Sequence, residues 1–259
     1  MVTYNELTVW LTRPQHQGQS ISKLLSDGGY SFVHQPAIEI DAVPADSKQA
    51  MQVNQLMLQL DSFKHLIFIS TNAVSHGMEH IENYWPQLPI GQHWYAIGTA
   101  TAKALLRFGV TAKTPVGEQN SEQLLALPEL VSAEGEKVII FSGVGGRQLL
   151  ADELCQRGAD VSIARCYTRD LPTQHSIHWR EALQSEKINV IIAASTETAK
   201  NSLVMAAEQG VEINSIPIIV PGARAVAVTA ELGFKRVIKA DDASDNAMMK
   251  ALASVAKQP

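Results

Sequence analysis

The segment His65-Leu-Ile-Phe-Ile-Ser-Thr-Asn-Ala73 has the same layout as Asn189-Val-Ile-Ile-Ala-Ala-Ser-Thr-Glu197, since each is an apolar run that ends in Ser-Thr. A short continuous apolar run is typical of a parallel strand that helices cover on both faces. The two serines, Ser70 and Ser195, lie 125 positions apart in a chain of 259 residues. This separation, close to half the chain, indicates that one structural unit occurs twice.

Further pairs of segments support an internal repeat. Residues 95–110 echo residues 219–234, and the first glycines of these two segments lie 124 positions apart. Residues 9–29 and 138–159 also match, because each contains a strand-like run, a turn and a helix-like segment that ends at glycine. The chain therefore contains two kinds of unit in the order a-b-a′-b′, although strand–turn–helix similarity is also common in unrelated α/β proteins.

Strand-like apolar runs alternate with amphipathic segments of helix length, which indicates an α/β fold with parallel sheets. The expected strands are residues 7–12, 31–35, 66–70, 94–97, 138–141, 161–164, 190–194, 217–220 and 237–239. The clearest expected helices are residues 19–27, 148–157, 198–209 and 226–232.

Two extended, proline-bounded segments interrupt this alternation, at about residues 36–43 and 163–171. We interpret them as paired connectors between two domains. Residues 42–164 would then form one domain, inserted into a discontinuous domain that combines residues 1–36 with residues 170–259. Each domain would contain about five strands, and a cleft between them is the expected ligand site.

Composition excludes several classes of protein. The longest apolar runs contain five residues, far fewer than the ~20 of a membrane helix. The net charge of −5, without a cluster of basic residues, argues against nucleic acid as a partner. The first residues lack the pattern of a secretory signal, and two cysteines cannot form a disulfide framework. We therefore expect a cytoplasmic protein with no membrane partner.

Small hydroxyl and glycine residues follow nearly every expected strand, where a helix begins. Helix N-termini have free backbone N–H groups and the positive end of the helix dipole, so these junctions suit anions. Serine, threonine and asparagine are also preferred N-caps, so a single junction can be explained without a ligand. Together the junctions predict binding of several carboxylates or phosphates, at residues 12–14, 70–72, 98–101, 142–147, 195–196 and 222–224.

No cofactor and no metal are expected. The Gly143–Gly146 loop does not complete G-x-G-x-x-G, because Gln148 stands in the place of the third glycine. No H-E-x-x-H pattern accompanies the closely spaced histidines, His76 with His80 and His175 with His178.

Tyr167 is the candidate for acid chemistry, because it lies in the second connector between Arg165 and Arg169 and should border the cleft. Two interpretations stay open at this point. The tyrosine packs across a domain junction, or its phenol donates a proton or hydrogen bond to a leaving hydroxyl.

Six short motifs follow one another with characteristic spacing: Leu11-Thr-Arg-Pro14, Phe68-Ile-Ser-Thr-Asn-Ala-Val74, Ala96-Ile-Gly-Thr-Ala-Thr-Ala-Lys-Ala-Leu105, Asn120-Ser-Glu-Gln-Leu-Leu125, Phe141-Ser-Gly-Val-Gly-Gly-Arg147 and Cys166-Tyr-Thr-Arg169. In this order they resemble the uroporphyrinogen-III synthase family over essentially the whole chain. One position departs from the family pattern. Ala225 stands where the second Gly-x-x-Thr-Ala element has threonine, whereas Thr101 keeps the first copy intact.

The resemblance implies two similar flavodoxin-like or Rossmann-like three-layer domains with parallel five-stranded sheets, joined by a two-stranded connector. It also implies a cofactor-independent lyase of tetrapyrrole and haem biosynthesis. Such an enzyme cyclises the linear tetrapyrrole hydroxymethylbilane to uroporphyrinogen III, with inversion of ring D and loss of water. We further expect a monomer, with a transient hand-over of substrate from the preceding pathway enzyme.

Under this resemblance Tyr167 is the expected proton donor to the leaving hydroxyl. The expected substrate-binding residues, which should hold the carboxylates, are Arg13, Ser70, Thr71, Asn72, Thr101, Ser142, Gly143, Arg147, Ser195, Thr196 and Arg224. Two alternatives remain open: a non-catalytic two-domain sensor or binding protein for a small anion, and a nucleotide-dependent enzyme that uses the Gly143–Gly146 loop.

Overall fold

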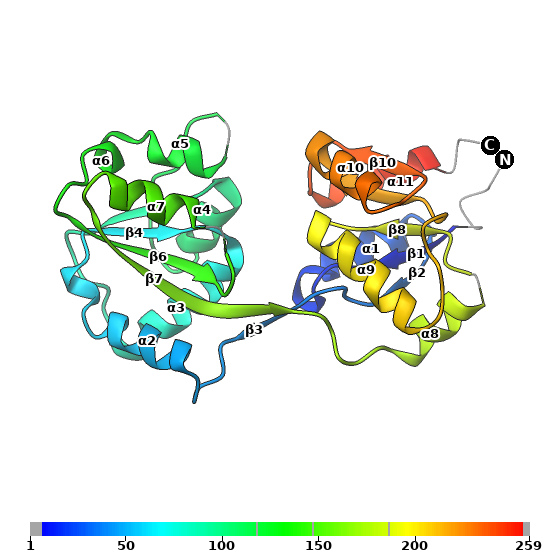
Figure 1. Cartoon of the computed structure of the whole chain (residues 1–259), viewed down its shortest axis with the longest axis horizontal. Helices are drawn as coiled ribbons and strands as arrows, with labels where there is room; N and C mark the ends of the chain where they lie inside the picture. The colour runs from blue at the N-terminus through cyan, green and yellow to red at the C-terminus, as the bar shows by residue number, and fades with distance from the viewer. Residues whose placement is uncertain (1–6, 118, 147, 186, 256–259) are drawn as a thin grey trace. The chain divides into compact units, whose positions relative to one another are not determined.

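The computed structural model describes residues 7–117, 119–146, 148–185 and 187–255. Contacts within the chain divide it into two compact units (Figure 1). Unit 1 comprises Met1–Glu39 with Asp170–Pro259, and unit 2 comprises Ile40–Arg169. Each unit contains one five-stranded sheet with helices beside it, which confirms the predicted α/β class.

The sheet of unit 1 has the strand order β10-β9-β8-β1-β2. Each neighbouring pair is parallel, with Val9 opposite Phe32 on one side of β1 and opposite Val190 on the other. The strands are β1 (Thr8–Leu11), β2 (Ser31–His34), β8 (Val190–Ile192), β9 (Ile218–Pro221) and β10 (Val237–Ala240).

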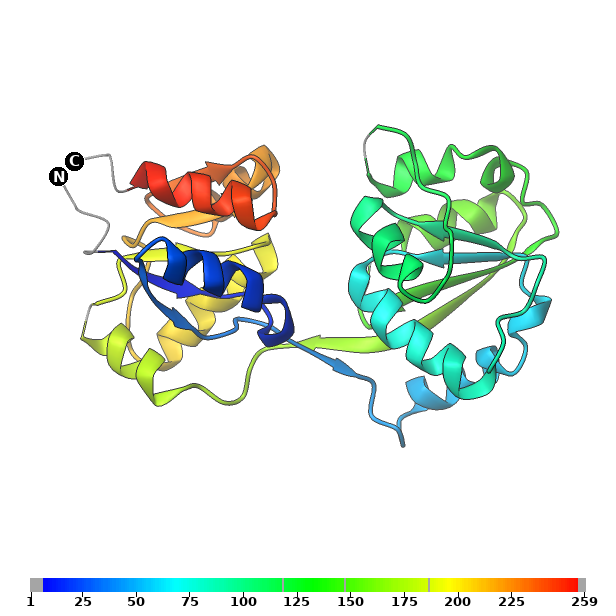
Figure 2. The same ribbon diagram turned by 180° about the vertical axis from the view of Figure 1, so that it is seen from behind.

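Helices cover both faces of this sheet. Leu25 of α1 and Leu252 of α11 belong to one buried cluster, and Figure 2 shows these two helices, blue and red, on the same face. Trp179 of α8 and Met205 of α9 belong to the cluster on the other face. The helices of unit 1 are η2 (Gln15–Gln17), α1 (Gln19–Asp27), α8 (Ile177–Gln184), α9 (Thr196–Glu208), α10 (Gly222–Glu231) and α11 (Asp245–Val255).

The sheet of unit 2 has the order β3-β7-β6-β4-β5. The pairs β4–β5, β4–β6 and β6–β7 are parallel, so these four strands place their carboxyl ends at one edge. The strands are β3 (Glu39–Ala42), β4 (His65–Phe68), β5 (His93–Ala96), β6 (Lys137–Gly143) and β7 (Asp160–Asp170).

Both faces of this second sheet are also covered. Helices α2, α3 and α4 pack around Phe68 and Phe141, whose rings stack with centroids 4.3 Å apart. Helices α5, α6 and α7 pack against Ile67 and Ile140 on the other face. The helices are α2 (Lys48–Met57), η3 (Leu60–Ser62), α3 (Thr71–Tyr84), α4 (Thr99–Leu106), α5 (Ser121–Leu125), α6 (Pro128–Val131) and α7 (Leu149–Gln156).

The two segments predicted as connectors belong to strands. Residues 39–42 form β3, and β7 continues to Asp170, well beyond the predicted end of that strand at residue 164. The backbone N–H of Val43 donates to the carbonyl oxygen of Cys166 at 3.3 Å. Both segments are therefore part of the sheet of unit 2, and Tyr167 lies toward the carboxyl end of β7.

The two Ser-Thr segments have the same local structure. Ser70 begins α3 and Ser195 begins α9, with φ of −165° and −159°. Each serine hydroxyl accepts a hydrogen bond from the backbone N–H three residues later, which is the usual N-cap arrangement. The structural match agrees with the predicted correspondence between these two segments.

Candidate functional site

A cavity of about 320 Å³ lies inside unit 2, at the carboxyl ends of β4, β6 and β7; we call it the unit 2 cavity. Four predicted site residues come together there, namely Ser70, Ser142, Gly143 and Tyr167. Its remaining lining consists of Ile69, Ile97, Ser121, Ile140, Gly145, Gly146, Leu150, Ala151, Ile163 and Arg169. The cavity thus combines hydroxyl groups, glycine backbone, a phenol and a guanidinium with an apolar wall.

A β-bulge directs Tyr167 toward this cavity. The register between β6 and β7 shifts there: Ser142 faces Arg165, but the next residue, Gly143, faces Tyr167, so Cys166 is the extra residue. Bulges of this kind re-aim side chains and occur often beside active sites. Tyr167 is only 4% exposed, and its phenol oxygen lies 3.1 Å from the Ser70 hydroxyl.

The ring of Tyr167 is fixed on several sides. The His76 ring lies against it, with centroids 5.6 Å apart and planes inclined by 26°. A Cβ atom at Gly143 would lie 2.7 Å from Cε2 and 2.8 Å from Cζ of Tyr167, so only glycine leaves room for the phenol. Ser70, His76 and Gly143 together determine where the phenol oxygen lies.

Ser70 has two hydrogen-bonding roles at the start of α3. Its hydroxyl oxygen accepts from the Ala73 N–H at 3.0 Å and also pairs with the phenol of Tyr167. The neighbouring predicted residues Thr71 and Asn72 are the first two residues of α3, exposed and half-buried respectively. Neither of them lines the unit 2 cavity.

Thr101 is buried in α4 and does not line the unit 2 cavity. The start of α4 already has a side-chain partner, since Gln119 accepts from the Thr99 N–H at 3.0 Å and donates to the Thr99 hydroxyl. In unit 1, Ala225 lies at the matching position of α10 and belongs to the core. Both positions therefore lie on the buried faces of their helices.

In unit 1, Ser195 forms a capping box with Thr198. The Ser195 N–H donates to the Thr198 hydroxyl, and the Thr198 N–H donates to the Ser195 hydroxyl, each at 3.1 Å. Thr196 is the first residue of α9 and is half-buried. Ser195 and Thr196 thus stand at a helix N-terminus, as the sequence predicted.

The three predicted arginines have different surroundings. Arg13 forms an ion pair with Asp245 at 3.1 Å and donates to the carbonyl of Ala243 at 2.5 Å, so its charge is already compensated inside unit 1. Arg224 is exposed near the start of α10. Arg147 lies outside the residues that the structure describes.

Arg169 and Ser121 are cavity residues that the sequence analysis did not assign. A signal for Arg169 was present, because it follows Tyr167 by two positions on one strand, and strand residues two apart share a face. Ser121 follows a long connection after α4, so no local pattern places it near Tyr167. Among the described residues, the lining of the cavity includes one arginine and no aspartate or glutamate, which suits an anionic ligand.

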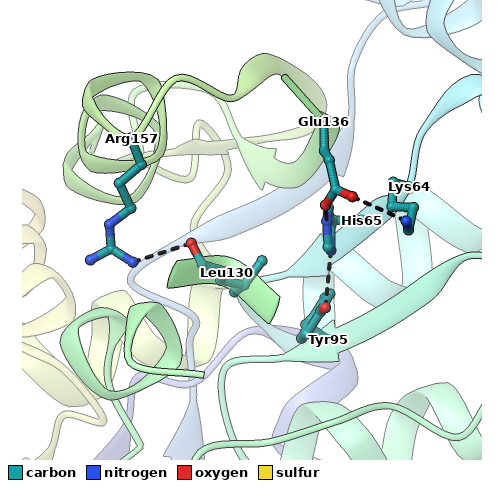
Figure 3. A network of polar contacts seen from close by, with 6 residues as sticks. All are labelled: Lys64, His65, Tyr95, Leu130, Glu136 and Arg157. Atoms are coloured by element: carbon teal, nitrogen blue, oxygen red, sulfur yellow. Dashed lines mark hydrogen bonds and ion pairs between the residues drawn. The ribbon is translucent and has the colours of Figure 1, made fainter. Parts of the chain in front are cut away.

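A second polar cluster lies near the amino ends of β4 and β6 and includes Tyr95 of β5; we call it the His65 cluster (Figure 3). Buried His65 Nε2 lies 2.5 Å from a Glu136 oxygen, and His65 Nδ1 lies 3.0 Å from the Tyr95 hydroxyl. Lys64 donates to the other Glu136 oxygen at 3.0 Å.

The His65 cluster forms a closed set of partners. Burial raises the pKa of Tyr95, so its hydroxyl is protonated and donates to His65 Nδ1. Hydrogen bonds from His65 and Lys64 lower the pKa of Glu136, whose carboxylate accepts from Nε2. Burial lowers the pKa of His65, although Glu136 acts in the opposite direction. The buried imidazole of His65 thus has a partner at each ring nitrogen, so the cluster is explained by stability.

Other chemistry has little support among the described residues. Burial raises the pKa of the Cys166 thiol to about 12, so this cysteine is not a thiolate at neutral pH. No group of three histidine, cysteine, aspartate or glutamate side chains in the described ranges is arranged to hold a metal ion. Within those ranges, no helix is both long and apolar enough to cross a membrane.

The family model and the relatives that this chain resembles carry the same name. A family model described as uroporphyrinogen-III synthase HemD matches residues 19–250. The uroporphyrinogen-III synthase of Escherichia coli (strain K12) is 29% identical over 95% of this chain and 100% of its own length. That of Proteus mirabilis is 30% identical over 68% of this chain and 89% of its own length.

Two solved structures show the same fold. A mutant uroporphyrinogen III synthase from the extremely thermophilic bacterium Thermus thermophilus aligns with a TM-score of 0.63 and 16% identity, over 97% of this chain and 100% of that chain. The uroporphyrinogen-III synthetase of Helicobacter pylori 26695 aligns with a TM-score of 0.62 and 18% identity, over 96% and 99%. At these identities the similarity concerns the fold.

Replacing Gly143 by alanine tests how the phenol is held. The new Cβ atom would overlap the ring of Tyr167, so we expect a loss of about 1–3 kcal/mol in unfolding free energy. The ring carbons of Tyr167 should also change their NMR shifts. Gly146→Ala is the matched control, since its nearest contact is a backbone oxygen at 3.3 Å. Equal effects of the two variants in urea denaturation would contradict this interpretation.

The His65 cluster predicts a pH dependence of stability. Because the pKa of His65 is lower in the folded protein, the unfolded chain binds more protons below the ordinary histidine pKa of about 6.5, and acidification favours unfolding. We expect the unfolding free energy to decrease from about pH 7.5 to about pH 5.5, with a smaller decrease in His65→Gln. The exposed control, His178→Gln, should keep the wild-type slope. An unchanged slope in His65→Gln would refute this assignment.

Proposed function

The chain belongs to the uroporphyrinogen-III synthase family, and on this basis we propose that it cyclises hydroxymethylbilane to uroporphyrinogen III with inversion of ring D and loss of water. The family match over residues 19–250 carries this conclusion. Full-length relatives with the same name support the lyase over the alternative of a non-catalytic anion sensor.

We propose that units 1 and 2 are separate domains, with boundaries near residues 36–43 and 163–171. The order β2-β1-β8-β9-β10 in unit 1 supports a flavodoxin-like domain, since it has the pattern 2-1-3-4-5 when its strands are renumbered along the chain. In unit 2 the order β5-β4-β6-β7 has the same start, and β3 takes the place of the fifth strand. Segments β3 and β7 would then form the two-stranded connector.

Tyr167 is the proposed acid. Its proton passes to the hydroxyl of the substrate, and the carbon–oxygen bond breaks. Water departs, and an azafulvene cation remains on the substrate. Ring D attacks this cation at its substituted carbon and gives a spiro intermediate. The original bond from that carbon to its methylene bridge then breaks, and the free α-carbon of ring D attacks the second azafulvene that this cleavage creates. Loss of a proton from that carbon restores the pyrrole and closes the macrocycle with ring D inverted, so that the net change is loss of one water. If the Ser70 hydroxyl donates to the phenol oxygen, the phenol proton is directed away from Ser70 and toward the substrate.

Control of the substrate conformation is the second proposed contribution. Correct orientation in intramolecular reactions lowers the barrier by about 7–11 kcal/mol. A general acid accelerates a reaction ~10²–10⁴-fold, which corresponds to a smaller reduction of about 3–5 kcal/mol. We propose that backbone N–H groups and hydroxyls at the strand–helix junctions bind the substrate carboxylates. These residues are Ser70, Thr71, Asn72, Thr101, Ser142, Gly143, Ser195 and Thr196, with Arg13, Arg147 and Arg224 as the cations of the sequence prediction. Two of these residues have other surroundings in the structure: Thr101 is buried in α4, and Arg13 forms an ion pair with Asp245.

We propose a cytoplasmic monomer, and its two free cysteines, Cys155 and Cys166, agree with a reducing compartment. A transient hand-over from the enzyme that makes hydroxymethylbilane would protect this reactive substrate from spontaneous closure.

The reaction itself is tested with synthetic hydroxymethylbilane. We expect mainly the type III isomer after chromatographic separation of the oxidised products, because the enzyme inverts ring D. The type I isomer forms without an enzyme. If the protein left the product entirely of type I, the sensor interpretation would replace the enzymatic one.

Tyr167→Phe tests the acid. Loss of the phenol hydroxyl removes both the proton and the hydrogen bond to Ser70, so we expect kcat to fall about 10²–10⁴-fold with a smaller change in KM. Tyr84→Phe is the control, since Tyr84 is an exposed tyrosine of α3. Wild-type turnover in Tyr167→Phe would remove Tyr167 from the mechanism.

A further inference from the structure

We propose that the unit 2 cavity binds a single pyrrole ring of the substrate and that Arg169 pairs with the carboxylates of that ring. This inference rests on the proposed function, because it names the part of the substrate that the cavity takes. It assigns to Arg169 a role that the sequence analysis gave to Arg13, Arg147 and Arg224.

The size of the cavity supports one ring. Its volume of about 320 Å³ is at the lower end of the ~300–1,000 Å³ of small-molecule sites. A linear tetrapyrrole does not fit in this space, whereas one pyrrole with its acetate and propionate does. The apolar side chains Ile69, Ile140 and Leu150 line the cavity and suit the faces of a flat heteroaromatic ring.

The polar part of the lining suits carboxylates. Ser121, Ser142 and Gly145, which carry hydroxyl and backbone N–H groups, line the same cavity as Arg169. Among the described lining residues Arg169 is the one cation, and none is an aspartate or glutamate. An arginine can bind a carboxylate through two parallel hydrogen bonds, which fixes both the position and the orientation of the ring.

The strand β7 connects this binding group to the proposed acid. Tyr167 and Arg169 are two positions apart on β7, and both line the cavity. A ring whose carboxylate is paired with Arg169 therefore lies beside the phenol of Tyr167. Arg169 acts through substrate position, so its loss should raise KM or weaken binding more than it lowers kcat.

The test uses a monopyrrole that carries one acetate and one propionate as the probe, titrated into the full-length protein and followed by NMR of backbone amides. In the wild type we expect shifts at the cavity residues. In Arg169→Gln we expect binding to be about 10–100-fold weaker, because hydrogen bonds to charged groups contribute that much. Arg169→Lys keeps the charge without the paired geometry and should be intermediate.

Arg165→Gln is the matched control. Arg165 lies on the same strand but lines a different cavity, with Gln52 and Gln55 of α2. It should bind the monopyrrole like the wild type. Equal weakening in Arg165→Gln and Arg169→Gln would show a general charge effect and overturn the proposal, as would undiminished binding in Arg169→Gln or no binding by the wild type.

Turnover separates this inference from the proposed function. Measured with hydroxymethylbilane, Arg169→Gln should raise KM about tenfold or more while still giving the type III isomer. If the wild type binds the monopyrrole at the cavity but forms no type III product, the proposed reaction fails and the pyrrole site stands. If the wild type forms type III product and Arg169→Gln keeps its KM, the pyrrole site fails and the proposed reaction stands.

Discussion

Burial of both faces of each parallel sheet is the constraint on which the rest of the structure depends. The four residues of β4, His65–Phe68, are all buried, and helices cover the sheet of unit 2 on each side. Polar side chains therefore concentrate at the two ends of the strands, where the backbone groups are not all paired within the sheet. In unit 2 this separation produces the cavity at the carboxyl ends and the His65 cluster at the amino ends.

The two ends differ in the chemistry of their polar groups. At the amino ends, Tyr95, His65, Glu136 and Lys64 form a chain of hydrogen bonds in which acids and bases are matched. Removing one member leaves a partner unpaired, so this chain stabilises the fold. At the carboxyl ends, the described lining of the cavity contains hydroxyls and Arg169 but no carboxylate. That composition suits a ligand that carries carboxylates itself.

Sequence patterns located the elements that depend on local signals. The apolar runs identified the strands from β1 to β10 other than β3, and the Ser-Thr endings identified the N-caps at Ser70 and Ser195. The segment Glu39–Ala42 alternates polar and apolar residues and forms an edge strand. The extended, proline-bounded stretch around it predicts a connector, so the sequence pattern does not identify this strand. Partners that are distant in sequence had no such signal: Arg13 lies 230 positions from Ala243, whose carbonyl it binds.

A polyanionic substrate and a protein of net charge −5 are compatible because binding depends on local groups. At physiological salt, ions screen the repulsion between exposed negative charges of the protein and of the substrate beyond about 8–10 Å. Within that range the ligand in the unit 2 cavity would meet Arg169, three serine hydroxyls and glycine backbone. The surroundings of Arg13 also matter, since its ion pair with Asp245 compensates a charge that sequence alone would count as available. The number of basic residues is thus a weaker guide to anion binding than the surroundings of each one.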